Sequence, residues 1–323
     1  MTQPLPQLDV SGRLRHLITL DGLDPGLIRE LLDRAQAYQR PPGQPPPRGD
    51  DLRGWTVANL FAEPSTRTRA SFELAAVRLG ADVINLDVML SSRVKGESII
   101  DTIYTLEAMQ VDVFVVRDAE PGIIEFIARH VGGHVSVISG GEAHVSHPTQ
   151  GLLDALTIRQ HKGDLRGLTV TIVGDIRHSR VARSAHRAFT ALGVGELRLV
   201  APPEMMPEPQ EFEGARRHVS FDEGIRGADV VMMLRIQKER ITVAKPTDIE
   251  RYHENYGLTA ARLATAKPQA IVMHPGPMNR GVEITSEVAD GPQSVIRRQV
   301  ANGVAMRMAV LAHIADARRR RAP

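Results

Sequence analysis

The segment Ser65-Thr66-Arg67-Thr68-Arg69 has the residue types of a phosphate-binding loop. It lies between a predicted strand at residues 56–61 and a predicted helix at residues 71–79. A chain that enters a helix presents unpaired backbone N–H groups and the positive end of the helix dipole to an anion, and hydroxyl and guanidinium groups add donors. The alternative is an ordinary helix cap at Ser65 with solvated arginines. We expect a phosphate site, but not nucleoside triphosphate hydrolysis, because the pattern G-x-x-x-x-G-K-[ST] is absent.

Other polar residues follow the next predicted strands of the first half, at residues 82–87, 111–116 and 135–139. The carboxyl ends of strands are where open α/β sheets bind ligands. Lys95 stands directly before a glycine, which suits a loop that brings a cation to an anionic ligand, although a solvated loop has the same composition. A lone histidine is usually structural, but His147 has polar neighbours and comes directly before a predicted helix, so a structural and a functional role both remain open. The candidate residues of these segments are Ser91, Lys95, Arg117, His147 and Gln150.

The second half of the chain carries weaker signals. The segment VGDIRHSR follows a predicted strand but has Gly174 alone in place of the pattern G-x-G-x-x-G, so a nicotinamide cofactor is not expected. Arg180, near the start of the next helix, is suited to hold a carboxylate. Arg235 and Gln237 follow another predicted strand and lie on one side if the chain stays extended. The segment HPGP at residues 274–277 closes a strand with a turn, and turn chemistry accounts for its prolines.

Composition excludes several classes of protein. Of the 323 residues 42% are hydrophobic, and no apolar run approaches the roughly 20 residues that cross a bilayer, so we expect a soluble protein without a membrane partner. The absence of cysteine excludes disulfide scaffolds, thiolate nucleophiles and iron–sulfur clusters. A formal charge of +2 does not indicate nucleic-acid binding, and the arginines at 318–321 are interpreted as a solvated tail. The amino terminus has no signal-peptide pattern, so a cytoplasmic location is expected.

Short Val- and Ile-rich runs alternate with segments of helical periodicity, and the alternation restarts near residues 152–161. Nearly continuous apolar strands are typical of buried parallel sheets. We therefore expect an α/β fold of two doubly wound parallel-sheet domains, with the active site in the cleft between them and a C-terminal helix that packs back on the first domain. The strands expected in the second half are residues 168–175, 196–201, 228–234 and 269–274. The expected domains are residues 1–151 plus 295–323 and residues 152–294.

Taken together, these segments indicate a protein family more specifically than any one of them does alone. STRTR and HPTQ, at residues 65–69 and 147–150, resemble the aspartate/ornithine carbamoyltransferase family. RIQKER and HPGPMNRGVEI, at residues 235–240 and 274–284, resemble its aspartate member. The resemblance covers nearly the whole chain. It implies transfer of the carbamoyl group from carbamoyl phosphate, bound by the first domain, to the α-amine of L-aspartate, bound by the second. It also implies an early step of pyrimidine biosynthesis, with no metal or organic cofactor.

The resemblance also implies a role for each candidate residue. The carbamoyl phosphate site would comprise Ser65, Thr66, Arg67, Thr68, Arg117, His147, Gln150, Gly276 and Pro277. The aspartate site would comprise Lys95, Arg180, Arg235 and Gln237. The catalytic residues would be Arg67, Thr68, Lys95, Arg117 and His147. In the family, the loop of Ser91 and Lys95 reaches into the active site of the neighbouring subunit, which implies a homotrimer or a larger assembly.

Two segments depart from the family pattern, and several alternatives remain. Gly140–Ala143 stands where GDG is familiar, and Gly276 gives HPGP where many relatives have HPLP. Ornithine carbamoyltransferase is one alternative, but Arg235 has the wrong sign for a cationic substrate and the chain has no HCLP-type cysteine. A catalytically silent scaffold subunit is opposed by the complete set of site residues, and a nucleotide-binding regulatory protein by the lack of a Gly-rich loop.

The segment before Leu14 resembles the extension of family members that are built into larger complexes. This resemblance makes a dihydroorotase-like partner chain compatible with the sequence. A regulatory partner chain is equally compatible.

Overall fold

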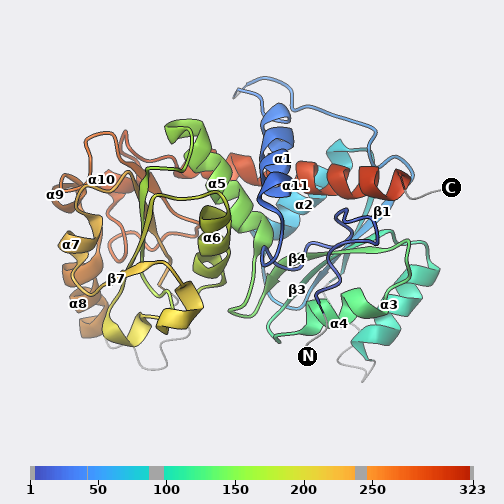
Figure 1. Ribbon diagram of the computed structural model, residues 1–323, viewed down its shortest axis with the longest axis horizontal. Coiled ribbons are helices and arrows are strands. Elements are labelled where there is room, and N and C mark those ends of the chain that lie inside the picture. The colour runs from blue at the N-terminus through green and yellow to red at the C-terminus, as the bar shows by residue number, and fades with distance from the viewer. Residues whose placement is uncertain (1–3, 42, 87–97, 237–245, 321–323) are drawn as a thin grey trace. The chain divides into compact units, whose positions relative to one another are not determined.

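The structure is a computed structural model that describes residues 4–41, 43–86, 98–236 and 246–320 (Figure 1). The chain divides into two compact units. Unit 1 comprises residues 1–152 and 302–323, and unit 2 comprises residues 153–301. The two boundaries fall inside helices, α5 (Pro148–Lys162) and α11 (Ile296–Arg319), rather than in loops.

The described part of unit 1 contains a four-stranded sheet whose paired strands are all parallel. The strand order is β2-β1-β3-β4. The strands are β1 (Thr56–Phe61), β2 (Asp82–Leu86), β3 (Val113–Asp118) and β4 (Ser136–Glu142). Each of the four strands expected from the sequence is therefore present. The central strands and the edge strand β4 are almost fully buried, whereas the other edge strand, β2, is partly exposed.

Helices cover both faces of this sheet. They are α1 (Pro25–Ala37), α2 (Thr66–Arg78), α3 (Ile99–Ala108) and α4 (Ile123–His130), with the C-terminal part of α11. On one face, Ile103 of α3 and Ile127 of α4 pack into the same core as Phe114 and Val137 of the sheet. The helices α1, α2 and α11 lie on the other face (Figure 1). The expected doubly wound arrangement is thus confirmed for this unit.

Helix α2 begins earlier than expected. The apolar periodicity predicts a helix over residues 71–79, but α2 begins at Thr66. The reason is that its first turn is polar and makes no contribution to the apolar pattern, which begins at the buried Phe72. Four of the five residues of STRTR therefore lie in the first turn of the helix, with Ser65 at the N-cap position.

The C-terminal helix α11 packs back on unit 1, as expected. The interpretation of residues 318–321 as a solvated tail is wrong for Arg318, which is helical and only partly exposed, whereas Arg319 is helical and exposed. Arg318 donates to Asp112 at 2.6 Å and its guanidinium lies 4.4 Å from the centre of the Trp55 ring. These are ion-pair and cation–π contacts, which a sequence pattern cannot distinguish from a solvated charge run. No helix of the described ranges is long and apolar enough to cross a membrane.

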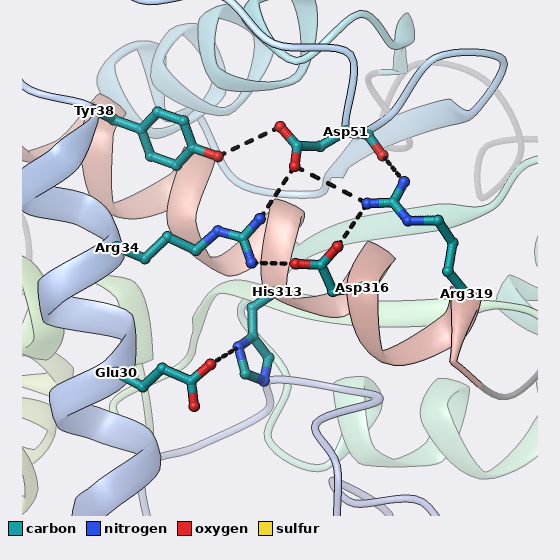
Figure 2. A network of polar contacts seen from close by, with 7 residues as sticks. All are labelled: Glu30, Arg34, Tyr38, Asp51, His313, Asp316 and Arg319. Carbon is teal, nitrogen blue, oxygen red and sulfur yellow. Dashed lines mark hydrogen bonds and ion pairs between the residues drawn. The ribbon is translucent and has the colours of Figure 1, made fainter.

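A network of charged side chains joins α11 to α1 and to Asp51 (Figure 2). Arg34 of α1 contacts Asp316 of α11 at 2.5 Å and Asp51 at 3.1 Å. Arg319 contacts both of these aspartates. Burial would raise the pKa of Asp316, but the hydrogen bonds from Arg319 and Arg34 outweigh it and lower the pKa. Beside them, His313 of α11 contacts Glu30 at 3.3 Å, and burial lowers the pKa of its imidazole.

Replacing Arg34 by methionine is expected to destabilise the protein. Methionine retains the aliphatic length but removes the guanidinium that contacts Asp316 at 2.5 Å and Asp51 at 3.1 Å, so that Arg319 alone bridges the two aspartates among the contacts described. We expect a loss of about 1–2 kcal/mol, between the values for exposed and for buried ion pairs. Urea unfolding measures it. Arg166→Met is the matched control, because Arg166 and Asp164 form an exposed pair, with side chains 77% and 52% exposed. Equal unfolding free energies for the two variants would contradict the prediction.

Unit 2 contains, among the described residues, a five-stranded parallel sheet in the order β7-β6-β5-β8-β9. The strands are β5 (Thr169–Val173), β6 (Glu196–Val200), β7 (Arg216–His218), β8 (Val230–Met233) and β9 (Ile271–Met273). Four were expected from the sequence. The edge strand β7 was not, because its three residues are Arg, Arg and His and carry no apolar signal.

The remaining elements of unit 2 connect and cover this sheet. The helices are α6 (Arg180–Ala191), α7 (Phe221–Ile225), α8 (Pro246–Tyr256), α9 (Ala260–Leu263) and α10 (Ser286–Ala289). Two 3-10 helices are η3 (Pro203–Met205) and η4 (Pro209–Phe212). Phe221 of α7 and Leu263 of α9 pack into one core with Val231 of β8 and Val272 of β9. Unit 2 is thus a second parallel α/β domain, as expected.

Candidate active site

The strand order gives each unit a point where ligands are expected. In unit 1 the chain passes from β1 to β2 on one side and then to β3 on the other side of β1. Crossover loops leave the sheet in opposite directions at such a switch point, and ligands bind there, outside the carboxyl ends of the strands. The switch point of unit 1 lies between β1 and β3. By the same reasoning that of unit 2 lies between β5 and β8.

The STRTR segment lies at the switch point of unit 1. Ser65, the N-cap residue of α2, makes no side-chain capping hydrogen bond, so the alternative of an ordinary serine cap is not supported. Thr66 and Arg67 are exposed and Thr68 is buried. The first turn of α2 thus offers backbone N–H groups, the helix dipole, hydroxyls and a guanidinium to an anion.

Arg117 lies near the end of β3, beside β1 in the sheet. The register between β3 and β4 shifts between Val116 and Arg117, and such irregularities redirect side chains. The Arg117 side chain is 12% exposed and its Nε lies 3.3 Å from Glu63, which follows β1. One terminal amino group donates to the carbonyl of Gly140 at 3.4 Å. Glu63 therefore neutralises part of the charge that a ligand at this point would meet.

The loop between β4 and α5 carries His147 and Gln150. Glu142 and Ser146 form an antiparallel bridge, with the Glu142 N–H donating to the Ser146 carbonyl at 2.8 Å. This bridge closes the loop directly before His147, whose carbonyl accepts from the N–H of Gln150 at 2.9 Å. The side chains of His147 and Gln150 are both buried. They are thus fixed at the end of β4, the strand adjacent to β3.

Glu142 also joins this loop to α4. Its carboxylate accepts from the N–H of Ile124 at 3.0 Å, at the beginning of α4, where the N-cap residue Gly122 has no side chain to do so. Burial raises the pKa of Glu142, although hydrogen bonds from the N–H groups of Ile124 and Gly122 lower it. Ala143 follows with a φ of +42°, a conformation that favours glycine. The familiar GDG is thus replaced at the cost of some backbone strain.

The raised pKa of Glu142 predicts a pH-dependent stability. The folded protein binds this proton more tightly than the unfolded chain, so the contribution of Glu142 to stability is complete below its ordinary pKa of 4.5 and is lost as the pH rises through the folded pKa. Glu142→Gln keeps an oxygen that accepts from Ile124 and removes the titration. We expect the variant to match or exceed the wild type in unfolding free energy at pH 7 and to lose this advantage in acid. A difference that does not vary with pH would contradict this.

In unit 2 the loop after β5 leads to Arg180. A Cβ at Gly174 would lie 2.9 Å from the Cβ of Leu234, so glycine is required where β5 and β8 end side by side. Asp175 is buried and accepts from the Nδ1 of His178 at 2.9 Å. Ser179 caps α6, and Arg180 occupies its first position. Gly174 thus has a packing role, and Arg180 lies at the switch point.

Two further segments of unit 2 carry predicted site residues. Arg235 comes shortly after β8, separated from its last residue by Leu234, and the carbonyl of the neighbouring Ile236 accepts from the side-chain amide of Asn279 at 3.0 Å. The turn after β9 contains a cis peptide bond between Gly276 and Pro277, and Gly276 has a φ of +66°. A residue with a side chain would be strained there, which gives a local reason for HPGP in place of HPLP.

Ser91, Lys95 and Gln237 lie outside the described residues. In unit 1 the structure brings Ser65–Thr68, Arg117, His147 and Gln150 to the carboxyl ends of three adjacent strands. In unit 2 it brings Arg180, Arg235, Gly276 and Pro277 to the ends of β5, β8 and β9.

Comparison with known proteins establishes the family. Residues 15–160 match the carbamoyl-P binding domain of aspartate/ornithine carbamoyltransferases, and residues 166–314 match the Asp/Orn binding domain. An aspartate transcarbamoylase from Trypanosoma cruzi, solved in complex with carbamoyl phosphate, is 32% identical, with 96% of this chain and 98% of that chain covered and a TM-score of 0.84. The chain belongs to the aspartate/ornithine carbamoyltransferase family.

Carbamoyltransferases of both substrate types resemble this chain. An ornithine carbamoyltransferase from Thermus thermophilus is 27% identical, with 93% of this chain and 98% of that chain covered and a TM-score of 0.82. The enzyme from Pyrococcus furiosus with the same name is 29% identical, with 92% and 96% covered and a TM-score of 0.81. The family resemblance seen in the sequence is therefore confirmed, and the acceptor amine has to be argued from the chemistry of the site.

The contacts of three residues of this carbamoyltransferase, Glu63, His274 and Glu283, were not predicted from the sequence. Glu63 contacts Arg117, and the pair formed by His274 and Glu283 is fully buried behind the turn at Gly276. The position of Glu63 between a strand and STRTR is a signal that the sequence offered. The partner of His274 is nine residues away along the chain, and no periodic pattern relates the two.

Proposed function

We propose that this carbamoyltransferase transfers the carbamoyl group of carbamoyl phosphate to the α-amine of L-aspartate, giving N-carbamoyl-L-aspartate and phosphate, as an early step of pyrimidine synthesis. The main support for this proposal is that Arg180 and Arg235 follow β5 and β8, at the switch point of unit 2. Guanidinium groups bind carboxylates through two parallel hydrogen bonds, and aspartate has two carboxylates. The side-chain ammonium of ornithine would meet like charge there. The related Trypanosoma cruzi enzyme has been solved in complex with carbamoyl phosphate and aspartate.

We assign the carbamoyl phosphate to the switch point of unit 1. Arg67 and the backbone amides at the beginning of α2 bind the phosphate, and the hydroxyls of Ser65 and Thr66 add donors. Thr68, Arg117 and His147 donate to the carbamoyl oxygen. Gln150 and the turn at Gly276 and Pro277 orient the carbamoyl NH2 group. Gln237 joins Arg180 and Arg235 in holding aspartate.

The reaction then needs position and charge stabilisation more than acid–base chemistry. The aspartate nitrogen attacks the carbamoyl carbon, and the carbonyl oxygen becomes an oxyanion. The oxyanion then re-forms the C=O bond while the C–O bond to phosphate breaks and the phosphate leaves with the bonding electrons. Each well-placed donor to the oxyanion contributes about 3 kcal/mol to transition-state stabilisation. Holding both substrates in place contributes roughly 7 kcal/mol or more. The departing phosphate accepts the proton of the amine.

We also propose that the active form is a homotrimer or a larger assembly, in which Ser91 and Lys95 act in the active site of a neighbouring subunit. Mixing Lys95→Ala chains with Arg67→Ala chains tests this. In a random mixture half of the sites have an intact Arg67, and half of these have a neighbour with an intact Lys95, so activity should recover to about a quarter of wild type. Each variant alone is the control. Recovery to no more than the sum of the separate variants would indicate self-contained sites.

The experiment that tests the function is an assay of the purified full-length chain with carbamoyl phosphate and either L-aspartate or L-ornithine. We expect carbamoyl aspartate and one equivalent of phosphate, with no product from ornithine. Product from ornithine alone would overturn the proposal in favour of the other substrate type. No product from either amine would favour a silent scaffold subunit.

A further inference from the structure

A buried hydrogen-bond network lies behind the turn that closes β9. His274 and Glu283 are both completely buried, with side chains 0% exposed, and the Nε2 of His274 lies 3.2 Å from Oε1 of Glu283. The Nδ1 of the same ring lies 2.8 Å from the backbone nitrogen of Gly276. The backbone N–H of His274 donates to Gln299 at 2.9 Å, and Gln299 donates to Asp154 at 2.7 Å. Both the ring and the backbone of His274 are therefore fixed.

These contacts determine the tautomer of His274. The Gly276 N–H is a donor, so Nδ1 must be an unprotonated acceptor. The remaining ring proton then lies on Nε2, where it donates to the carboxylate of Glu283. The imidazole is thus neutral, with Nδ1 as the acceptor and Nε2 as the donor. A protonated ring would direct an N–H group at the N–H of Gly276.

Glu283 extends the network to a second segment. Its Oε1 also accepts from the backbone N–H of Asn279, at 2.5 Å. The side-chain amide of Asn279 in turn donates to the carbonyl of Ile236 at 3.0 Å. Ile236 directly follows Arg235, the residue assigned to aspartate. One continuous chain of hydrogen bonds therefore joins the turn at Gly276 to the segment that carries Arg235.

We infer that His274, with Glu283 and Asn279, is a positioning residue for the transfer reaction, which fixes the turn at Gly276 and the Arg235 segment in one arrangement within unit 2. The inference rests on the proposed function, because the roles of Gly276 and Arg235 come from it. None of the three residues contacts a substrate in this assignment. Their effect is geometric: an error of about 1 Å in the position of a reacting group lowers the rate by up to about 100-fold.

A purely structural role would not need this arrangement. Replacing a buried ion-paired or hydrogen-bonded set by apolar residues of similar volume is often neutral or stabilising. What an apolar residue cannot do is accept from the N–H of Gly276 and donate to Glu283 at a fixed spacing. The network therefore fixes a local geometry that an apolar set could not fix.

Two substitutions of His274 separate its two hydrogen bonds. Asparagine places an oxygen near the position of Nδ1, so His274→Asn keeps the acceptor for Gly276 and loses the donor to Glu283. Glutamine places an NH2 group near the position of Nε2, so His274→Gln keeps the donor and loses the acceptor. We expect the kcat of His274→Gln to fall at least about tenfold and that of His274→Asn to fall by less than about threefold. The affinity for inorganic phosphate should be unchanged in both, because the phosphate residues lie in unit 1.

A third variant tests the other end of the network and does not depend on the folding of the first two. Asn279→Ala keeps the backbone N–H that donates to Glu283 and removes only the bond to Ile236. We expect it to raise the KM for aspartate about fivefold or more, with a smaller change in kcat. The control is Asn255→Ala, because Asn255 makes the same kind of amide-to-carbonyl bond, to Arg251, on the exposed face of α8. It should behave as the wild type.

Several outcomes would overturn the inference. These are equal kcat values for His274→Asn and His274→Gln, kcat losses that merely follow the losses in unfolding free energy, or an Asn279→Ala variant that matches Asn255→Ala. Wild-type enzyme is assayed beside the variants with both aspartate and ornithine. A wild type that uses only ornithine would refute the proposed function, while the comparison of the His274 variants could still be made with that substrate.

Discussion

Arg67→Ala is expected to lower kcat/KM for carbamoyl phosphate by about 1000-fold or more, close to complete loss of transfer. Arg67 is exposed in the first turn of α2, at the switch point of unit 1, and we assign it to the phosphate. The phosphate bears charge in the substrate and gains more as the C–O bond breaks. A guanidinium that meets it therefore stabilises the transition state more than the ground state, and its loss should lower kcat as well as raise KM. Steady-state kinetics with carbamoyl phosphate as the varied substrate measures both.

The control is Arg29→Ala, since Arg29 is an exposed arginine on α1 in the same unit. Its activity should equal that of the wild type. Arg67→Lys should recover only part of the loss, because an ammonium keeps the charge but not the paired donors. Normal turnover by Arg67→Ala would show that the helix terminus and hydroxyls alone hold the phosphate, or that the phosphate binds elsewhere.

The fold of this carbamoyltransferase is largely predictable from its sequence because most of its strands are buried on both faces. A run such as Thr56–Phe61 has no polar alternation that would suggest a solvated sheet, and it coincides with β1. The exceptions have local causes. The strand Arg216–His218 is too short and too charged to show a pattern, and the first turn of α2 is too polar. Tertiary pairing defines the first of these elements, and backbone hydrogen bonds define the second.

The candidate site could be predicted only in part from the sequence, for a different reason. The residue types at the strand ends predict anion binding, but the order of strands in a sheet is not encoded in local spacing. The order β2-β1-β3-β4 places Arg117 beside the STRTR segment. Contacts such as Glu63 with Arg117 depend on that order. The expected first domain boundary, after residue 151, already lies inside α5, and the units divide after residue 152. The expected second boundary, after residue 294, comes before α11, whereas the units divide inside this helix, after residue 301, where its helical periodicity gives no signal.

Arg235→Ala is expected to raise the KM for aspartate by about 100-fold, with little change in the affinity for carbamoyl phosphate. The residue lies at the end of β8 in unit 2, whereas the phosphate residues lie in unit 1. Loss of a paired, charge-assisted hydrogen bond to a carboxylate removes about 1.5–3 kcal/mol of binding free energy, which corresponds to roughly 10- to 150-fold in affinity. The aspartate dependence of the rate at saturating carbamoyl phosphate measures this effect.

The distribution of the loss between the two substrates decides what Arg235 does. Arg217→Ala is the control, because Arg217 is an exposed arginine of unit 2 on the edge strand β7. It should leave both KM values unchanged. An equal rise in the KM values for aspartate and carbamoyl phosphate would show that Arg235 serves both substrates. The assignment of carbamoyl phosphate to unit 1 and aspartate to unit 2 would then be wrong. A rise for aspartate alone would identify the guanidinium as a carboxylate ligand, and this is the property that distinguishes an aspartate site from one for a cationic amine.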